Sequence, residues 1–361
     1  MIRIVKTKEK NAKQMALIRL GAFLLALCAG GLFVLVLGYN PFEIYGTILS
    51  GAFRSKMAVQ STIKFMIPLL IAALGVTLSF KMKFWNIGGE GQIIMGAVFA
   101  TYFALYHENW PFPVLFVVML LAGIVGGGLW ALIPAFFKTR FGTNETLFTL
   151  MLNYIALYLV SWLQEGPWRD PNANGFPKIP SFSPDVTLPK VLGVQMGWII
   201  ALILTVVVFV YLKYTKHGYE ISVVGQSKAT AAYAGMRVDR IVLRTMFLSG
   251  AIAGICGMVQ VAGSDKTLTT GVAGGIGFTA IIVAWLAQLN PFGSLVIAFL
   301  FAVLEKGASV VQSQFGLAID CADVLQGIIL FFVLGCEFFI RYRFVRDAGA
   351  PKEGGKTDAA H

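Results

Sequence analysis

Charged residues are scarce in this chain. Of its 361 residues, 29 are lysine or arginine and 18 are aspartate or glutamate, so 13% are charged, whereas soluble domains carry roughly one quarter. Hydrophobic residues make up 57%, the mean hydropathy is +0.75, and apolar runs of about 20 residues recur along nearly the whole length. This composition excludes an ordinary soluble fold, and we expect membrane lipids to surround the chain.

Histidine and cysteine are also rare. They are His107, His217, His361, Cys28, Cys256, Cys321 and Cys336. None forms a C-x-x-C pair or a cluster with ligand spacing, so we expect free thiols, no metal site and no cofactor. The chain also lacks a G-x-x-x-x-G-K-[ST] phosphate loop and a Ser/His/Asp or Cys/His set. We therefore expect that it is not an enzyme.

Ten apolar segments predict an all-α, polytopic membrane protein with about ten transmembrane helices. The segments are 17–39, 62–80, 87–106, 113–137, 146–164, 197–214, 242–262, 274–289, 292–311 and 324–341. The eighth and ninth are weak and are separated by the turn sequence NPFG, so they are either short spans or one re-entrant hairpin. Both alternatives leave the sidedness of the chain unchanged.

The basic residues predict the orientation. With the N-terminus inside, 21 of the 29 lysines and arginines fall on the cytoplasmic side, six fall outside, and Lys64 and Lys306 lie within spans. By the positive-inside rule both termini are cytoplasmic, and the net charge of +11 needs no nucleic-acid partner to explain it. The predicted parts are an N-terminal segment (1–16), a transmembrane domain (17–341) and a disordered cytoplasmic tail (342–361).

Two loops are longer than a simple connection requires. The external loop, 165–197, is rich in proline, so we expect an extended, irregular segment without a long helix. The cytoplasmic loop, 213–244, contains Ser227 as a good N-cap, an alanine-rich stretch from Lys228 to Ala234, and Gly235 as a stop. This pattern predicts a short cytoplasmic helix.

Polar residues interrupt one apolar run in the sequence FWNIGGEGQ. Asn86 and Glu90 are four apart and would share one face of a helix, with Gln92 close by. They either border a substrate path or serve packing, with Glu90 paired to Lys81 or Lys83, and the sequence leaves both alternatives open. Asn153, a lone amide in 146–164, predicts an interhelical hydrogen bond first and a ligand contact second.

Four stretches together resemble a known family. They are FWNIGGEGQIIMGA, TNETLFTLMLNYIALYLVSWL, GQSKATAAYAGM and GIGFTAIIVAWLAQLNPFGSLVIAF. They resemble permease subunits of bacterial ABC importers, in the branch of ribose-type sugar, branched-chain amino acid and nucleoside importers. The resemblance covers about residues 15–345. It implies a type II importer-like helical bundle, multi-pass in the bacterial cell (inner) membrane, that moves a small neutral solute.

The resemblance implies a nucleoside as solute, with a simple sugar or a flavin-like vitamin as alternatives. An ion-gradient-driven secondary transporter is a remoter alternative to the ATP-driven importer. It also implies three partners: an ABC ATPase subunit, a paralogous second permease that forms a heterodimer, and an external substrate-binding lipoprotein. The candidates for the substrate path are Asn86, Glu90, Gln92 and Asn153. The short cytoplasmic helix would be the coupling helix that meets the ATPase, and its alternative is a helix lying on lipid. Its residues are Gly225, Ser227, Lys228, Ala231, Ala232, Tyr233, Ala234 and Gly235.

Overall fold

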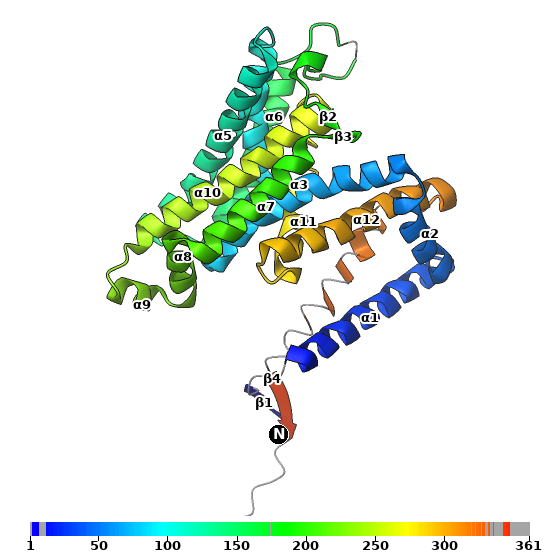
Figure 1. Ribbon diagram of the computed structural model, residues 1–361, viewed down its shortest axis with the longest axis vertical. Helices are drawn as coiled ribbons and strands as arrows, with labels where there is room; N and C mark the ends of the chain where they lie inside the picture. The colour runs from blue at the N-terminus through cyan, green and yellow to red at the C-terminus, as the bar shows by residue number, and fades with distance from the viewer. Residues whose placement is uncertain are drawn as a thin grey trace, which may run out of the picture. The chain divides into compact units, whose positions relative to one another are not determined.

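A computed structural model gives the fold. It describes residues 2–6, 12–173, 175–318, 320–321, 323–325, 327–328, 331–332, 335 and 342–346. The chain divides into two compact units, one made of residues 1–45 with 318–361 and the other of residues 46–317 (Figure 1).

The first unit joins the two ends of the chain. Strand β1 (Ile2–Lys6) pairs antiparallel with β4 (Tyr342–Arg346), with Ile4 opposite Phe344. Helix α1 (Ala12–Val36) follows, and the Tyr45 hydroxyl donates to the carbonyl of Leu27 at 2.9 Å. Strands were not expected in an all-α fold with a disordered tail over 342–361. That expectation is wrong for Tyr342–Arg346, whose Tyr-Arg-Phe-Val-Arg sequence suits a strand once a partner is present.

Helices make up most of the second unit. They are α3 (Lys56–Lys81), α4 (Gly89–Tyr106), α5 (Phe112–Phe141), α6 (Glu145–Glu165), α7 (Gly197–Tyr214), α8 (Lys216–Gln226), α9 (Lys228–Tyr233), α10 (Val238–Val259), α11 (Ile276–Leu286) and α12 (Pro291–Phe315). Helix α2 (Pro41–Phe53) crosses the boundary of the units, and a π-helical turn, η2 (Gln260–Asp265), extends α10. The loop after α6 contains a 3₁₀ turn, η1 (Pro184–Val186), and a hairpin of β2 (Lys190–Val191) and β3 (Val194–Gln195). As expected, this loop carries no long helix.

Within the described residues, fewer helices than the expected ten are long and apolar enough to cross a membrane. Among the described residues six qualify: α3, α5, α6, α7, α10 with η2, and α12. The pair Leu20–Val36 and Pro41–Phe53 counts as a seventh if it forms one broken span. The expected span 87–106 corresponds to α4, whose polar first turn lowers its hydropathy. The expected span 324–341 lies mostly outside the described residues.

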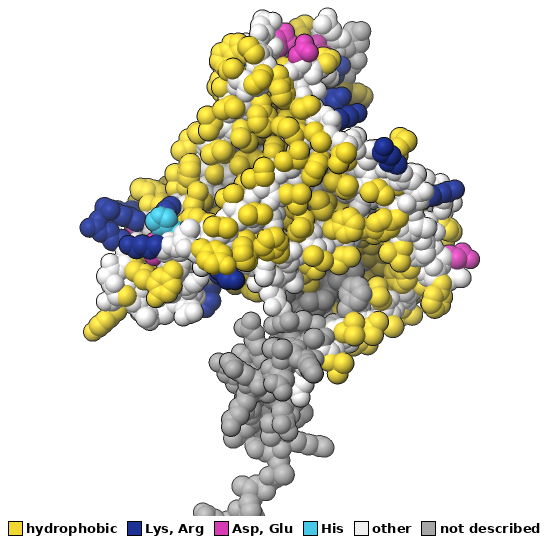
Figure 2. All heavy atoms as spheres, viewed as in Figure 1, with side chains coloured by type: hydrophobic (Ala, Val, Ile, Leu, Met, Phe, Trp, Pro, Cys, Tyr) yellow, Lys and Arg dark blue, Asp and Glu magenta, His cyan; other side chains and the backbone are white. Residues whose placement is uncertain are grey.

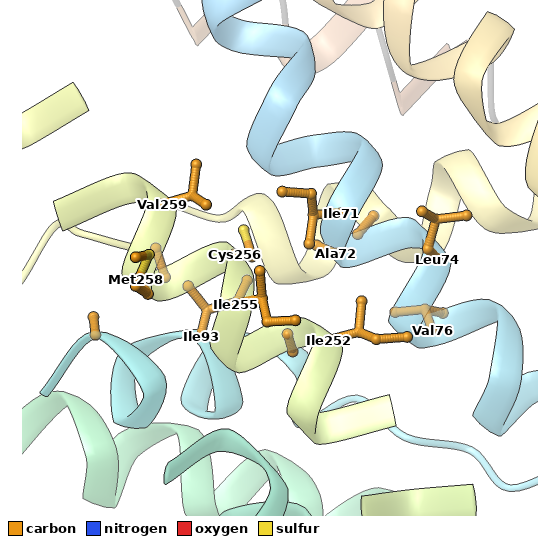
Figure 3. Packing of buried hydrophobic residues seen from close by; sticks show 14 of the residues in the cluster. Ile71, Ala72, Leu74, Val76, Ile93, Ile252, Ile255, Cys256, Met258 and Val259 are labelled. Atoms are coloured by element: carbon orange, nitrogen blue, oxygen red, sulfur yellow. The ribbon is translucent and has the colours of Figure 1, made fainter. Parts of the chain in front are cut away.

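Small residues hold α4, α5 and α10 together. A Cβ atom at Gly96 would overlap the backbone of Gly254, and one at Gly254 would overlap the carbonyl of Gly123. Without side chains between them, the helices approach closely enough for extensive backbone contact. Figure 3 shows Ile71 of α3, Ile93 of α4 and Ile255 of α10, which belong to one buried cluster.

The segment 266–286, which contains most of the expected eighth span, runs along α3 from one end to the other. Its start contacts the 165–197 loop, where Thr267 Oγ1 donates to the carbonyl of Ile179 at 3.1 Å. The same loop contacts the N-terminal part of α3, because Gln60 Nε2 donates to the carbonyl of Leu192 at 2.9 Å. Its end lies at the opposite end of α3, where Trp285 packs against Phe80 with ring centroids 6.0 Å apart. The segment therefore crosses the unit once, as irregular chain followed by the 11-residue helix α11.

Candidate functional site

The amides of Asn86 and Gln92 form a closed pair at the start of α4. Asn86 lies in the turn before the helix, because α4 begins at Gly89, so the expected shared helix face of Asn86 and Glu90 is wrong. Asn86 Oδ1 accepts from Gly88 N and from Gln92 Nε2, each at 3.0 Å, and Asn86 Nδ2 donates to Gln92 Oε1 at 3.2 Å. Asn86 is 1% exposed and Gln92 is 2% exposed, so neither amide is open to solvent within this chain.

Helix α6 supplies the partners for the next backbone groups. Asn153 Oδ1 accepts from Gly91 N at 2.9 Å, and Asn153 Nδ2 donates to the carbonyl of Ile87 at 2.9 Å. Thr149 Oγ1 accepts from Ile87 N at 3.2 Å. The first N–H groups of a helix have no partner inside the helix. Here the neighbouring helix α6 provides the acceptor for one of them, Gly91 N, and for Ile87 N just before the helix. This geometry confirms the interhelical hydrogen bond predicted for Asn153.

The Glu90 carboxylate binds the N-terminus of α11. Its Oε1 accepts from Gly275 N at 2.7 Å, and its Oε2 accepts from Gly277 N at 2.8 Å. A carboxylate suits this position because the N-terminal N–H groups and the helix dipole both favour negative charge. The carboxylate thus accepts hydrogen bonds from backbone and does not pair with Lys81 or Lys83, the pairing that the packing alternative allowed. A Cβ atom at Gly277 would lie 2.8 Å from Glu90 Oε2, so a residue without a side chain is needed there.

The polar cluster of Asn86, Glu90, Gln92 and Asn153 lies half-way along α10. Asn86 Nδ2 is 3.5 Å from Ser249 Oγ, and Gly96, six residues after Glu90, meets Gly254. Ser249 and Gly254 are the twelfth and seventeenth residues of the 28-residue helix Val238–Asp265. The four candidates for the substrate path are therefore brought together, but their hydrogen bonds are made within the chain. The structure uses them to fix α6, α4 and α11 to one another.

The cytoplasmic loop forms two helices. Ser227 Oγ accepts from Thr230 N at 3.2 Å and caps α9, and Gly235 ends the turn with φ +76°, as predicted. Helix α8 was not predicted. Its signal in the sequence is Thr215, whose Oγ1 caps the helix by accepting from Gly218 N at 3.1 Å, followed by buried residues with helical spacing at Gly218, Ile221, Val224 and Gly225.

The candidate coupling residues divide into buried and exposed ones. Ala231 is fully buried, and a Cβ atom at Gly225 would overlap the carbonyl of Lys81, so these two residues serve packing within the chain. The exposed ones are Lys228, Ala232, Tyr233, Ala234 and Gly235. Tyr233 is 99% exposed, and Figure 2 shows basic side chains gathered near α8 and α9.

An ion pair ties α8 to α10. Arg244 Nη2 lies 2.8 Å from Glu220 Oε2, and Arg244 Nη1 lies 2.5 Å from His217 Nδ1. The hydrogen bond from Arg244 holds the pKa of Glu220 below its ordinary value. Among the described residues no group of three histidine, cysteine, aspartate or glutamate side chains is placed to hold a metal ion.

Comparison with known proteins places the chain in a family. Residues 57–334 match the family described as branched-chain amino acid transport system / permease component. The chain belongs to this family. As a permease component with several apolar helices, it is a multi-pass membrane protein.

Individual relatives cover almost the whole chain. It is 32% identical to the glucose ABC transporter permease protein TsgB13 of Haloferax volcanii, over 89% of this chain and 87% of that protein. It is 29% identical to the guanosine ABC transporter permease protein NupP of Bacillus subtilis, over 90% and 94%. It is 28% identical to the nucleoside ABC transporter permease protein NupB of Lactococcus lactis, over 95% of each.

Proposed function

We propose that the chain is a permease subunit of an ATP-driven importer in a bacterial cell membrane and that it carries a nucleoside. Two of the relatives named above transport guanosine or nucleosides by name, and both align over nine-tenths or more of this chain. A simple sugar is the second candidate, because the relative named for glucose has the higher identity, 32%.

The exposed face of α9 carries the proposal of ATP coupling. Ser227 and Gly235 fix both ends of this short helix, and the Glu220–Arg244 ion pair holds its neighbour α8 on α10. The small side chains of Ala232 and Ala234 allow a partner surface to approach, and the exposed ring of Tyr233 is a suitable anchor for it. Alanine adds little apolar area for binding to lipid, which disfavours a role at the membrane surface. The proposed partners are an ATPase subunit, which would bind at α9, a second permease and an external substrate-binding lipoprotein.

The polar cluster has an indirect role in this proposal. The hydrogen-bonding groups of the cluster already have partners within the chain, so they are not free to bind the solute. The cluster borders the path and holds the crossing 266–286 in place. A change at these residues would then move the crossing and not remove a contact with the solute.

The test of the proposed function is uptake by vesicles that contain the whole transporter. We expect labelled guanosine to enter with ATP, excess unlabelled nucleoside to compete and glucose not to compete. ATP depletion should stop uptake, while an uncoupler should leave it intact. Uptake that an uncoupler abolishes in ATP-loaded vesicles would indicate a secondary transporter. Uptake of labelled glucose without uptake of labelled guanosine would favour the sugar.

The coupling role of α9 has its own prediction. Ala234→Glu places charge and bulk on the exposed face, so uptake should fall at least tenfold and binding of the ATPase should weaken, because an uncompensated charge at an interface costs over 1.4 kcal/mol. Asn172→Glu, at an exposed site in the loop after α6, is the control and should transport normally. Normal uptake and normal ATPase binding by Ala234→Glu would contradict the coupling role.

A further inference from the structure

The first half of the crossing 266–286 is irregular chain. From Lys266 to Gly275 it contains neither helix nor strand. Its start is held at the 165–197 loop, where Phe182 N donates to the Lys266 carbonyl at 2.8 Å, and its end is held at Glu90, half-way along α10. This stretch therefore passes through the half of the bundle nearest the 165–197 loop without the hydrogen bonds of a regular helix.

One side of this stretch is packed and the other is open. Leu268, Val272 and Ala273 are at most 1% exposed. The exposed members are Lys266 at its start, followed by Thr269, Thr270, Gly271 and Gly274. Within the described part of the chain, the backbone N–H groups of Thr269, Thr270 and Gly271 have no hydrogen-bond acceptor. Hydrocarbon does not tolerate exposed backbone of this kind, which occurs at membrane depth only against protein or water. Lipid is therefore excluded as the neighbour of this strip.

We propose that Thr269–Gly274 lines the solute path and binds a neutral, polyhydroxylated solute; this inference rests on the proposed function. The strip offers N–H donors and two hydroxyl groups that both donate and accept, and it carries no charged side chain. Such groups complement the hydroxyls of a ribose or hexose and need no counter-ion. Gly271 and Gly274 allow a ligand to approach the backbone. Phe278 follows on the first turn of α11 and is 42% exposed, which offers a flat apolar ring for a base or sugar to stack on.

The experiment uses the complete transporter with a permease whose four native cysteines are replaced. Thr270→Cys should react with a charged, membrane-impermeant methanethiosulfonate reagent, and guanosine should slow the reaction. Val206→Cys is the control, because Val206 is 50% exposed in the middle of the apolar helix α7. A thiol in lipid does not ionise, so the control should stay unreactive. Thr270→Val, which keeps the shape, should raise the KM for uptake about threefold to tenfold, as expected for one lost hydrogen bond.

The outcomes separate this inference from the proposed function. If guanosine is taken up but Thr270→Cys never reacts, or reacts only when the second permease is omitted, the strip is buried against protein and the inference fails alone. An unchanged KM for Thr270→Val overturns the solute contact in the same way. If glucose protects Thr270→Cys and guanosine is neither transported nor protective, the inference stands and the nucleoside assignment fails.

Discussion

At the scale of single residues, Glu90 connects two distant parts of the sequence. It is the only side chain of the cluster that reaches α11, and it satisfies two N–H groups that helix geometry leaves without partners. Asn86, Gln92 and Asn153 hold the backbone around it, so the direction of the carboxylate depends on all three amides. The role of Glu90 is thus to position the crossing at mid-depth.

Replacing Glu90 separates its charge from its shape. In Glu90→Gln one side-chain oxygen can still accept from a glycine N–H, but the amide NH2 group faces the other glycine N–H, and two donors then meet. The free energy of unfolding should therefore fall by roughly 1 to 3 kcal/mol. Glu90→Leu leaves both glycine N–H groups unpaired and should cost roughly 2 to 5 kcal/mol. Thermal unfolding of the purified protein measures both, and uptake normalised to folded protein reports the position of the path. Glu165→Gln, at an exposed site at the end of α6, should change stability by less than about 0.5 kcal/mol. Wild-type stability of Glu90→Leu would contradict the positioning role.

At the scale of helices, the contact of α4, α5 and α10 depends on glycine. Gly254→Ala should force α10 away from α5, because the added methyl group would overlap the Gly123 carbonyl, at a cost of roughly 1 to 3 kcal/mol. Gly46→Ala, in α2 where an added methyl group meets nothing within 4 Å, should be neutral or stabilise by up to about 1 kcal/mol. Unfolding of the two variants side by side is the measurement, and equal stability would show that the close approach is not required.

The link between α8 and α10 allows a charge-swap test. Glu220→Arg and Arg244→Glu should each lower stability by roughly 1 kcal/mol and reduce uptake, and the double variant should recover much of both. Since the pKa of Glu220 is below its ordinary value of about 4.3, its contribution is complete at neutral pH. That contribution is lost only as the pH falls through the lowered folded-state pKa. Titration of Glu220 should therefore not weaken the pair between about pH 6 and pH 8. Failure of the double variant to recover would show that the pair does not couple the helices.

At the scale of the whole molecule, sidedness is the main prediction. Figure 1 shows α8 and α9 at one end of α7 and α10, and the hairpin β2–β3 at the opposite end. In a background without native cysteines, Ser181→Cys should react with an impermeant thiol reagent on intact cells, while Ala229→Cys should react only after permeabilisation. Both positions are exposed in the chain, so access is decided by the membrane alone. Reaction of Ala229→Cys on intact cells would reverse the predicted orientation.

The sequence by itself determined the class of protein, most of the helices and the family. Long apolar runs and few charges admit few alternatives to a helical membrane protein, because backbone groups in lipid must find partners within their own segment. Local rules also predicted the cap at Ser227 and the stop at Gly235, which depend only on neighbouring residues. Helix α8 was missed, although its cap at Thr215 and its buried spacing were available in the sequence.

Only the tertiary structure decided which groups the polar residues at the start of α4 contact. Glu90 lies 185 residues before Gly275, and no periodicity relates them. The same holds for the crossing 266–286, where a short helix and irregular chain share one passage because Glu90 and the 165–197 loop hold its two ends. Burial of Ala231 and the pairing of β1 with β4 likewise depend on surfaces that are far apart in the chain. Such contacts follow from packing of the whole unit, whereas caps and apolar runs follow from neighbours along the sequence.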